Sequence, residues 1–571
     1  MRNEIMAIKA ITAMLLVVVA VLAASSVASS QGPSATNAVL RPSSSIIEAS
    51  VLARAGFPSE AIKYCLDEAN VRPEDIDHVA FSRNPLAHLH SKAFFALTRR
   101  PSLDLIRSRL ANMARIWRSR GTLASALGAG ESSLRAKVHR IEHHRAHSAS
   151  AFFVSPFDTA AVVSMDAFGD FRSTMVSLGE GNHMEPVSTV EFPHSLGILY
   201  TAVTQYLGFP HYGDEYKVMG LAAFGKPTYL DELRRMVRPE PRGTFKLDLQ
   251  YFRHASYGVP MTWNDCEPEI GRAYSDHMVK RLGPARDPSE ELTGRHEDIA
   301  ASLQAALEEV YFHILNYAHE ATGQKALALA GGVAFNSVAN GRILDSTPFE
   351  NVYIQSAAGD AGTALGAAYS VHHQWSSQAR QFVMNSAYWG PGFDESRYAD
   401  VLAGHGLRSD RLADDELYRR TARAVADGKI VGWFQGRVEW GPRALGNRSI
   451  IADPRRAEMK DILNARIKRR EPFRPFAPSV LIEAVGQYFE KTYPDPFMIK
   501  VYPVRPDKRA LIPAVTHVDG TGRLQTVSRE DNPRYWSLIK EFERQTGVPI
   551  VLNTSFNENE PIVCTPEQAV E

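Results

Sequence analysis

Cysteine is scarce in this sequence, and neither charge predominates. The three cysteines, Cys65, Cys266 and Cys564, are spread over 571 residues, which is too few for a disulfide framework or a cysteine-rich zinc module and is typical of a cytosolic protein. The 64 Lys and Arg balance the 64 Asp and Glu, so the formal net charge is zero. This balance argues against a protein that binds nucleic acid through a globally basic surface.

Two common nucleotide-binding motifs are also missing. Neither GxxxxGK[ST] nor GxGxxG occurs, so a nucleotide would have to be held in another way. No internal repeat is found. The composition is that of a globular protein, with 44% hydrophobic and 22% charged residues. At about 150 residues per domain, the length predicts two to four domains.

A long apolar run stands near the N-terminus, from Ala10 to Ala24, with Arg2 and Lys9 before it and small residues after it. A basic flank, a short apolar core and a small-residue site are typical of a secretory signal peptide. The run is shorter than the roughly 20 residues of a spanning helix. Three interpretations stay open: an export signal, a membrane anchor, or an upstream stretch attached by a wrong start codon or reading frame. Residues 33–46 are rich in Pro and Ser and predict a linker, so residues 1–45 are interpreted as leader and linker.

The rest of the chain alternates apolar β-branched runs with longer helical periods, which is typical of an α/β fold. Thr159–Met165 predicts a buried strand that ends in a tight turn over Asp166–Gly169. Apolar spacings of three and four predict a helix over His296–Thr322, followed by a strand over Ala326–Leu329. Domains are therefore predicted over 46–390 and 391–571.

The second predicted domain begins after Pro391 and has its own helices and strands. Strands are predicted over Ile430–Phe434 and Val548–Leu552, and helices from Asp453 to Arg469 and from Pro533 to Gly547. Thr565 and Pro566 resemble an N-cap and a first helical turn. Because the chain stops at Glu571, we expect the C-terminus to be truncated.

Two histidines, His143 and His147, are spaced to project from one face of a helix and to chelate one cation. Taken alone, such a pair is more often a surface or capping pair. Asp166 at the end of a strand and Asp360 in a Gly-rich turn favour a metal site, because ligands in α/β folds gather where strands end. Nitrogen and oxygen ligands suit Fe, Mn or Zn without choosing among them. His144 is expected to face solvent, and His313 and His319 are expected to be structural.

Basic residues gather between Arg437 and Arg474, where eleven Lys or Arg stand against five Asp or Glu. A solvated face is the usual interpretation of such a cluster, and nucleic-acid contact is another. Rigid Pro and Gly between the cations also suit a pocket that clamps a multiply charged anion. The cations singled out for this pocket are Arg437, Arg443, Arg448, Lys468 and Arg474, with hydroxyl and amide donors from NTSFN at 553–557.

Together these stretches closely resemble the carbamoyltransferase family that includes nodulation-protein and aminoglycoside O-carbamoyltransferases. The family's motifs occur in order from about Gly56 to the end, as HHRAHSASAFFVSPF, DEYKVMGLAAFGKP, LAGGVAFNSVANGRI, GRVEWGPRALGNRSIIADPR, KRREPFRPFAPS and LNTSFNENEPIVCTP. The resemblance implies an actin-like ATPase-fold N-terminal domain and a YrdC-like α/β C-terminal domain. The family's opening strand and His-containing phosphate turn have no counterpart here, so the first strand is expected to be missing and the activity of this chain is in question.

The resemblance also implies a reaction and a set of residues. The YrdC-like domain would make carbamoyl-adenylate from carbamoyl phosphate and ATP, and the other domain would pass the carbamoyl group to an acceptor hydroxyl. His143, His147, Asp166 and Asp360 would hold Fe²⁺ or another divalent metal. The implied catalytic residues are Lys468, Arg474 and Arg443, and the implied substrate-binding residues are Arg523, Ser555, Asn553, Gly331, Gly332 and Asn336.

The leading hypothesis is an ATP-dependent O-carbamoyltransferase of the cytoplasm. Its acceptor would be a small-molecule hydroxyl on a sugar, an aminoglycoside or another natural product, with no nucleic-acid partner, and a homodimer stays open. One rival is a threonylcarbamoyl-type tRNA modification enzyme, against which the neutral charge argues weakly. Another rival is a membrane-anchored binding protein with impaired catalysis. The acceptor has no readable signature in the sequence, because acceptor pockets are built from loops.

Overall fold

The computed structural model describes residues 57–99, 102–128, 130, 134–259, 261–264, 267–376, 379–558 and 561–571. The chain divides into two compact units. Unit 1 runs to Phe335 and resumes over Ile343–Val383, and unit 2 contains Asn336–Arg342 and Met384–Glu571. The leader predicted over residues 1–45 lies outside the described residues. In the described part of the chain, no helix combines the length and the apolarity needed to cross a bilayer.

Unit 1 is built on a mixed sheet of five strands in the order β11-β10-β3-β4-β5. β3 (Thr159–Gly169), β4 (Arg172–Glu180) and β5 (His183–Glu191) form an antiparallel meander. β10 (Ala326–Ala330) pairs in parallel with β3 and with β11 (Asn351–Ile354). The continuous apolar run at the start of β3 suits its place inside the sheet, where both faces of a strand are covered.

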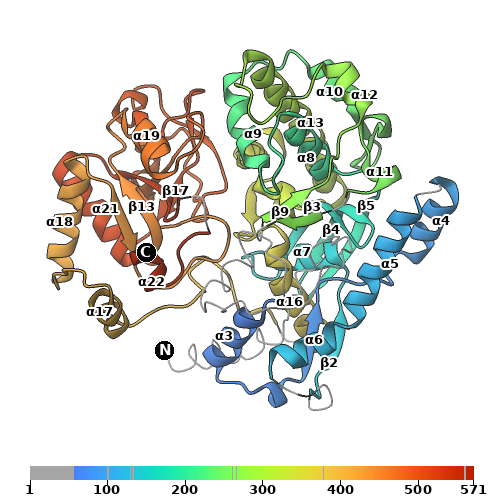
Figure 1. Ribbon diagram of the computed structural model, residues 1–571, viewed down its shortest axis with the longest axis horizontal. Coiled ribbons are helices and arrows are strands. Elements are labelled where there is room, and N and C mark those ends of the chain that lie inside the picture. The colour runs from blue at the N-terminus through green and yellow to red at the C-terminus, as the bar shows by residue number, and fades with distance from the viewer. Residues whose placement is uncertain are drawn as a thin grey trace. The chain divides into compact units, whose positions relative to one another are not determined.

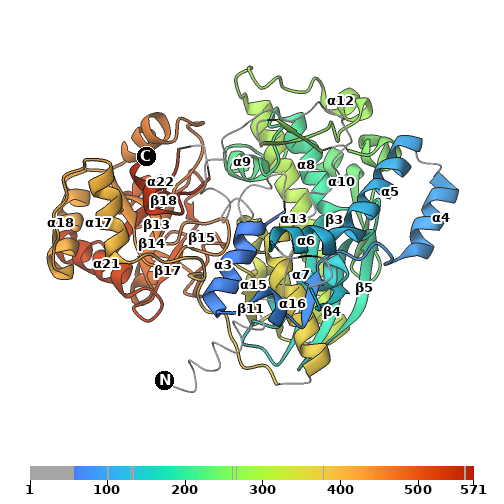
Figure 2. The same ribbon diagram turned by 60° about the horizontal axis from the view of Figure 1, so that its bottom comes forward.

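Helices cover the sheet on both faces (Figures 1 and 2). α7 (His143–Phe152) packs on β3, β4 and β10 and is itself covered by α16 (Thr363–Ser376). α8 (Leu196–Tyr206) and α13 (Gly294–Thr322) pack against β3 from the other side. The predicted long helix is confirmed as α13, which ends at Gly323 in the left-handed conformation, with φ of 68°.

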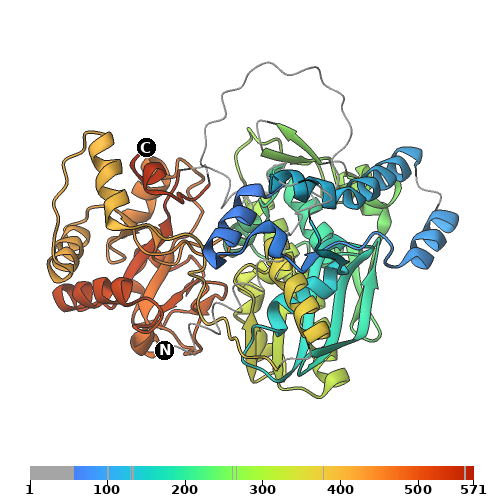
Figure 3. The same ribbon diagram turned by 90° about the horizontal axis from the view of Figure 1, so that it is seen from below.

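Helices and short strands surround this framework, and the N-terminal helices gather along one side of the sheet, as the blue ribbons of Figure 3 show. β1 (His78–Phe81) and β2 (Lys137–Arg140) form a separate parallel pair. The other helices of this unit are α3 (Ser59–Ala69), α4 (Leu89–Arg99), α5 (Leu103–Trp117), α6 (Ser119–Ala126), α9 (Glu215–Leu221), α10 (Leu230–Met236), α11 (His254–Tyr257), α12 (Asp276–Leu282) and α15 (Ile343–Ser346). The other strands are β6 (Val237–Glu240), β7 (Thr244–Leu247), β8 (Met261–Asn264) and β9 (Glu267–Ile270).

The tight turn predicted over Asp166–Gly169 is wrong. β3 continues to Gly169 through a register shift between Met165 and Gly169, and the chain turns instead at Asp170 and Phe171. These two residues have φ of 49° and 81°, the positive values that a two-residue hairpin turn needs. A bulge cannot be predicted from the pattern of apolar residues alone. Because of this bulge, Asp166 lies within β3 and not in a turn.

Unit 2 contains a second sheet, in the order β12-β13-β18-β14-β17. The strands are β12 (Val431–Phe434), β13 (Arg448–Ala452), β18 (Ile550–Ser555), β14 (Ala477–Leu481) and β17 (Gln525–Val527), and only β14 and β17 pair in parallel. The remaining elements are α14 (Ser337–Asn340), α17 (Glu395–Gly404), α18 (Asp414–Ala426), α19 (Met459–Ile462), α20 (Val485–Tyr488), α21 (Pro533–Thr546), α22 (Pro566–Val570), β15 (Tyr502–Pro503) and β16 (Thr521–Gly522).

Two helix predictions in unit 2 had different outcomes. α21 is confirmed: the Asn532 side chain caps it, and Gly547 ends it with φ of 77°. The helix predicted from Asp453 to Arg469 is wrong over its first turns, because buried Asp453 bonds to the main chain and the guanidinium of Arg455. Only α19 is α-helical, and a π-helical turn over Leu463–Ile467 follows it.

Candidate functional site

Three separate segments of unit 1 bring His143, His147, Asp166 and Asp360 together. His143 is the first residue of α7, and His147 follows one helical turn later. The Glu142 side chain caps α7 by accepting a hydrogen bond from the Arg145 amide at 2.8 Å. This cap fixes the start of α7 at His143. Asp166 stands in β3, and Asp360 opens a short 3-10 helix before α16.

The four side chains converge on one point. Nε2 of His143 lies 3.0 Å from Nε2 of His147 and 3.1 Å from Oδ2 of Asp166. Oδ1 of Asp360 lies 3.4 Å from Nε2 of His143 and 3.5 Å from Nε2 of His147. A cation with bonds of about 2.1 Å would separate neighbouring ligand atoms by roughly 3.0–3.4 Å in octahedral or tetrahedral geometry. The arrangement therefore fits a divalent metal.

The charges of the four side chains shift the pKa values of His147 and Asp166. Burial by itself would lower the pKa of His147, but hydrogen bonds with Asp166 and Asp360 and their charges raise it to about 9. Burial would raise the pKa of Asp166, yet its contacts with His143 and His147 hold it well below the usual value. The carboxylates thus remain ionised and attract a positive charge, whether a proton or a metal ion.

The surroundings hold the carboxylates in place. The amide of Gly332 donates to Oδ1 of Asp166 at 3.1 Å, and Gly331 passes so close to β3 that a Cβ there would lie 2.0 Å from the carbonyl oxygen of Met165. Both glycines were predicted to bind substrate, and in the structure they adjoin Asp166, a candidate metal ligand. Arg83 donates to Oδ2 of Asp360 at 3.3 Å and to the Phe168 carbonyl at 3.4 Å.

Arg83 and Asp170 were missed by sequence analysis. Oδ2 of Asp170 accepts hydrogen bonds from the amides of His143 at 3.0 Å and Asn84 at 2.7 Å, so this hairpin residue anchors the start of α7. The available signal for Arg83 was its position just after the buried β1. A charged residue after a buried strand is a candidate for a site at the strand ends.

The prediction for His144 is wrong, whereas those for His313 and His319 are confirmed. His144 is fully buried, and its Nδ1 lies 2.9 Å from the Ser164 hydroxyl. It cannot face solvent because α7 is enclosed between the sheet and α16. Nε2 of His313 pairs with the Glu240 carbonyl, and Nδ1 of His319 pairs with the Gln324 carbonyl, as expected of structural residues.

A second candidate site in unit 2 is strongly cationic. Burial, followed by the positive charges of Arg443, Arg470 and Arg474, lowers the pKa of the Arg523 guanidinium well below its usual value. Nε of Arg523 is buried without a hydrogen-bond partner among the described residues. The carboxylate of Asp495 acts in the opposite direction. Arginine keeps its charge in proteins, and guanidinium groups gathered near one another suit an anion of several charges. Arg470 was not singled out from the sequence.

Lys468 lies beside the end of β18, the central strand of the sheet. Its amide closes the π-helical turn by donating to the Leu463 carbonyl at 2.8 Å. Its ammonium donates to the carbonyl oxygens of Ser555 at 2.6 Å and Asn557 at 2.7 Å, and it lies 3.2 Å from Oγ of Ser555. The structure therefore joins two predicted residues, Lys468 and Ser555, that are far apart in the sequence. π-Helical turns are frequent at functional sites.

Arg448 was wrongly assigned to the anion pocket. Its guanidinium is buried, lies 3.7 Å over the ring of Phe434 and donates to the carbonyls of Cys564, Gln435 and Gly436. These bonds occupy the guanidinium in the core.

Two predicted substrate-binding residues of unit 2 also bond internally. Asn553 is buried, and its amide nitrogen lies within 3.1 Å of the Ala444 carbonyl, Oγ of Ser479 and Oε1 of Gln525. Asn336 caps α14 by accepting from the Ala339 amide at 3.0 Å. The structure thus shows packing partners for both residues.

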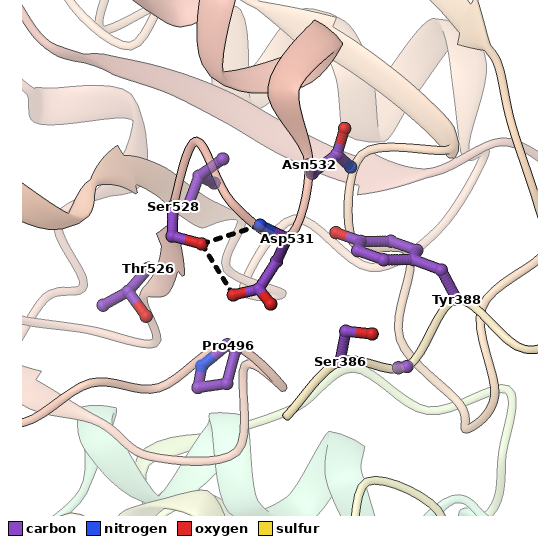
Figure 4. A pocket seen from close by; sticks show the side chains of 9 residues that line it. Ser386, Tyr388, Pro496, Thr526, Ser528, Asp531 and Asn532 are labelled. Atoms are coloured by element: carbon purple, nitrogen blue, oxygen red, sulfur yellow. Dashed lines mark hydrogen bonds between the residues drawn. The ribbon is translucent and has the colours of Figure 1, made fainter. Parts of the chain in front are cut away.

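A small pocket lies elsewhere in unit 2, between Ser386–Tyr388 and the loop that leads into α21 (Figure 4). Ser528 donates to Oδ2 of Asp531 at 2.6 Å, and the Tyr388 hydroxyl donates to the Leu445 carbonyl at 2.8 Å. None of the residues predicted for catalysis or binding is among those that line it. The pocket is therefore not part of either candidate site.

Comparison with known proteins covers both units. The family models described as "Carbamoyltransferase N-terminus" and "Carbamoyltransferase C-terminus" match residues 50–369 and 422–571. The uncharacterized protein sll1178 of Synechocystis sp. is 41% identical over 90% of this chain and 87% of its own length. Nodulation protein NolNO of Sinorhizobium fredii is 41% identical over 90% of this chain and 72% of its own.

A more distant relative has a name that states a reaction. The 3'-hydroxymethylcephem-O-carbamoyltransferase of Amycolatopsis lactamdurans is 30% identical over 73% of this chain and 74% of its own length. Among solved structures, HypF of T. kodakarensis aligns with 14% identity and a TM-score of 0.27, over 55% of this chain and 44% of that one. That likeness is too weak to support an argument about the fold.

Proposed function

The chain belongs to the carbamoyltransferase family, and from that premise we propose that it is an ATP-dependent O-carbamoyltransferase. In the proposed reaction, carbamoyl phosphate, ATP and one water molecule give carbamoyl-adenylate, inorganic phosphate and pyrophosphate. An acceptor hydroxyl then takes the carbamoyl group, and AMP leaves. The family and the mixed α/β fold support an enzyme of this class; the ATP-dependent route is our proposal.

The cationic site of unit 2 supports adenylate formation there. Arg443, Arg470, Arg474 and Arg523 would bind the phosphate groups of carbamoyl phosphate and ATP, because guanidinium groups match phosphate oxygens in pairs. Lys468, held against Ser555, would add a positive charge beside them. Preorganised cations stabilise the negative charge that develops on leaving phosphate groups without reorganisation during the reaction. The implied YrdC-like identity of this unit is part of the proposal.

The buried ligand cluster of unit 1 supports carbamoyl transfer there. His143, His147, Asp166 and Asp360 would hold a divalent metal, Fe²⁺ by the family resemblance. Such an ion, when bound, supplies positive charge that neutralises a departing phosphate group. Gly332 and Arg83 would keep the two carboxylates oriented through the hydrogen bonds described above. The implied actin-like ATPase fold is supported by the antiparallel meander that two parallel strands extend.

We further propose a small-molecule hydroxyl as the acceptor and the cytoplasm as the location. The name of the cephem enzyme from A. lactamdurans supports such an acceptor, and ATP and carbamoyl phosphate are intracellular substrates. The observation that carries the proposal is the convergence of two imidazoles and two carboxylates in unit 1. The arginine cluster of unit 2 supports it independently. One is suited to a metal and the other to phosphate groups.

Two variants test the proposal from opposite sides. His147→Ala is expected to lose bound metal and carbamoyl transfer while it keeps pyrophosphate release that depends on carbamoyl phosphate. Lys468→Ala is expected to lose that pyrophosphate release while it keeps bound metal. His313→Ala, a histidine of unit 1 that bonds to a main-chain carbonyl, is the control. Unchanged metal content in His147→Ala would overturn the metal assignment, and unchanged pyrophosphate release in Lys468→Ala would overturn the adenylation site.

A further inference from the structure

Two consecutive helices of unit 1, α4 and α5, expose apolar side chains to solvent. In α5, Ile106, Leu110, Met113 and Trp117 follow one another at spacings of four, three and four, which makes one apolar stripe on the helix. Such a stripe ordinarily faces a core. Here Leu110 is 55% exposed and Trp117 is 48% exposed, so the stripe is largely uncovered.

α4 repeats this pattern at the same end of the unit (Figure 2). Leu97 is 78% exposed and Phe94 is 69% exposed, and Leu86 and Leu89 nearby are also exposed. We call these residues the α4–α5 surface: Leu86, Leu89, Phe94, Leu97, Ile106, Leu110 and Trp117. Exposed apolar side chains in this number on neighbouring helices are typical of interaction sites.

The same segment is strongly basic. From Leu89 to Trp117 the sequence has six Lys or Arg and one Asp, a net charge of 6 minus 1, or +5, whereas the whole chain has none. Arg99 and Arg107 are exposed beside the apolar residues, and the guanidinium of Arg140 lies 4.4 Å over the ring of Trp117. Leucine, phenylalanine and tryptophan combined with arginine are typical of helices that lie in the interface of an anionic membrane.

We propose that the α4–α5 surface docks on the surface of an anionic lipid bilayer. Its positive charge is complementary to anionic headgroups, and its exposed leucines and aromatic rings enter the boundary between headgroups and acyl chains. The helices have 11 and 15 residues, or roughly 16 and 22 Å at 1.5 Å per residue. They are too short to span a bilayer, so the protein lies on the membrane. A second copy of the chain is a less favourable occupant, because two segments that each have a net charge of +5 would repel each other.

Vesicle flotation of the full-length protein tests this proposal. We expect it to bind vesicles of phosphatidylcholine with 30% phosphatidylglycerol, and to bind pure phosphatidylcholine or vesicles in 0.5 M NaCl at least tenfold more weakly. The double substitution Leu97→Asp and Leu110→Asp should lower binding at least tenfold. The control is Val518→Asp, at an apolar residue of unit 2 that is 60% exposed; it should bind like the parent. The substituted positions are exposed, and an unchanged melting temperature verifies that the variant folds.

A second measurement locates the contact. Brominated lipids should quench part of the tryptophan fluorescence of the parent protein and less of that of Trp117→Phe. Binding by the double variant equal to that of the parent would overturn the proposal and assign vesicle binding to another segment, such as the apolar run Ala10–Ala24. Absence of vesicle binding would also overturn the proposal. If the parent protein is then a dimer and the double variant a monomer, the α4–α5 surface binds a second copy of the chain.

Discussion

His147 ties metal binding to pH through its two carboxylate neighbours. Without a metal its pKa is raised to about 9, so a proton occupies this imidazole at neutral pH. A metal must displace that proton, and its affinity therefore depends on how readily the proton leaves. Metal binding thus replaces the proton on His147 with the positive charge of the metal ion.

We predict that the apparent affinity for a divalent metal rises by about tenfold per pH unit from pH 7 to pH 9 and levels off above pH 9, because one proton is released below that pH. The sign follows from the raised pKa: the protonated form predominates below it and competes with the metal. Calorimetric titration in two buffers of different ionisation enthalpy measures the affinity and the released proton. An affinity that stays flat from pH 7 to pH 9 would contradict the assignment of His147.

Arg523 and Arg448 should respond in opposite ways to loss of charge. Arg523 is destabilised by burial and by three neighbouring guanidinium groups, whereas Arg448 donates to several carbonyls in the core. We predict that Arg523→Met leaves the melting temperature of unit 2 unchanged or raises it, while KM for carbamoyl phosphate rises by a factor that corresponds to roughly 2 kcal/mol.

Arg448→Met is the matched control for that experiment. It should lower the melting temperature, because it leaves buried carbonyls without donors at a cost of about 1–3 kcal/mol. Differential scanning calorimetry and initial-rate kinetics measure both effects. A large loss of stability in Arg523→Met would mean that this side chain serves the fold instead of an anion.

At this scale the sequence predicted the residues whose chemistry is local. The spacing of His143 and His147, the position of Asp166 after an apolar strand pattern and the motif resemblance were enough to predict the cluster. The errors concern partners from distant segments. His144 is buried because α16 covers α7, and the Arg448 guanidinium donates to carbonyls from residues as distant as Cys564. Helical spacing and local charge do not contain that information.

At the scale of the elements, the chain just after β10 passes close to β3 near the ligand cluster. Gly331 has φ of 94°, and a Cβ there would lie 2.0 Å from the main-chain oxygen of Met165. Gly323, at the end of α13, has a similar φ of 68° but no atom within 4 Å of a Cβ. The two glycines thus share a positive φ and differ in their surroundings.

We predict that Gly323→Ala destabilises unit 1 by about 1–2 kcal/mol, the cost of the left-handed conformation. Gly331→Ala should cost a total of roughly 2–5 kcal/mol, because overpacking adds to that strain. It should also weaken metal binding, since the adjacent Gly332 amide orients Asp166. Urea unfolding and metal titration measure these effects. Equal destabilisation by the two substitutions would show that β10 and β3 can move apart at low cost.

Two of the predicted long elements were confirmed, whereas the helix predicted from Asp453 was wrong over its first turns, and the irregular stretches of backbone were not predicted. Apolar spacing placed α13 and the first part of β3, because that pattern depends on one buried face. The bulge after Met165 and the π-helical turn before Lys468 depend instead on contacts with segments that are distant in the sequence. Both irregularities adjoin candidate site residues, as is common at functional sites.

On the scale of the whole molecule, each unit has a core and a candidate ligand of its own. We predict that divalent metal raises the melting temperature of unit 1 alone, and that carbamoyl phosphate with ATP raises that of unit 2 alone, because a ligand stabilises the part that binds it. Scanning calorimetry of the parent, His147→Ala and Lys468→Ala measures both shifts. A metal-induced shift that persists in His147→Ala would place the metal elsewhere.

The short segment Asn336–Arg342 limits how nature or an engineer could exchange the two units between relatives. It belongs to unit 2 although unit 1 precedes and follows it in the chain. The Ser337 carbonyl accepts from the Val501 amide at 2.9 Å, the Asn340 side chain donates to the Ile499 carbonyl, and a Cβ on Gly341 would lie 1.9 Å from the Val501 oxygen. A hybrid gene with a single junction near residue 384 would therefore combine residues 384–571 from one parent with the segment Asn336–Arg342 from the other. Recombination that preserves a working protein must transfer both pieces together.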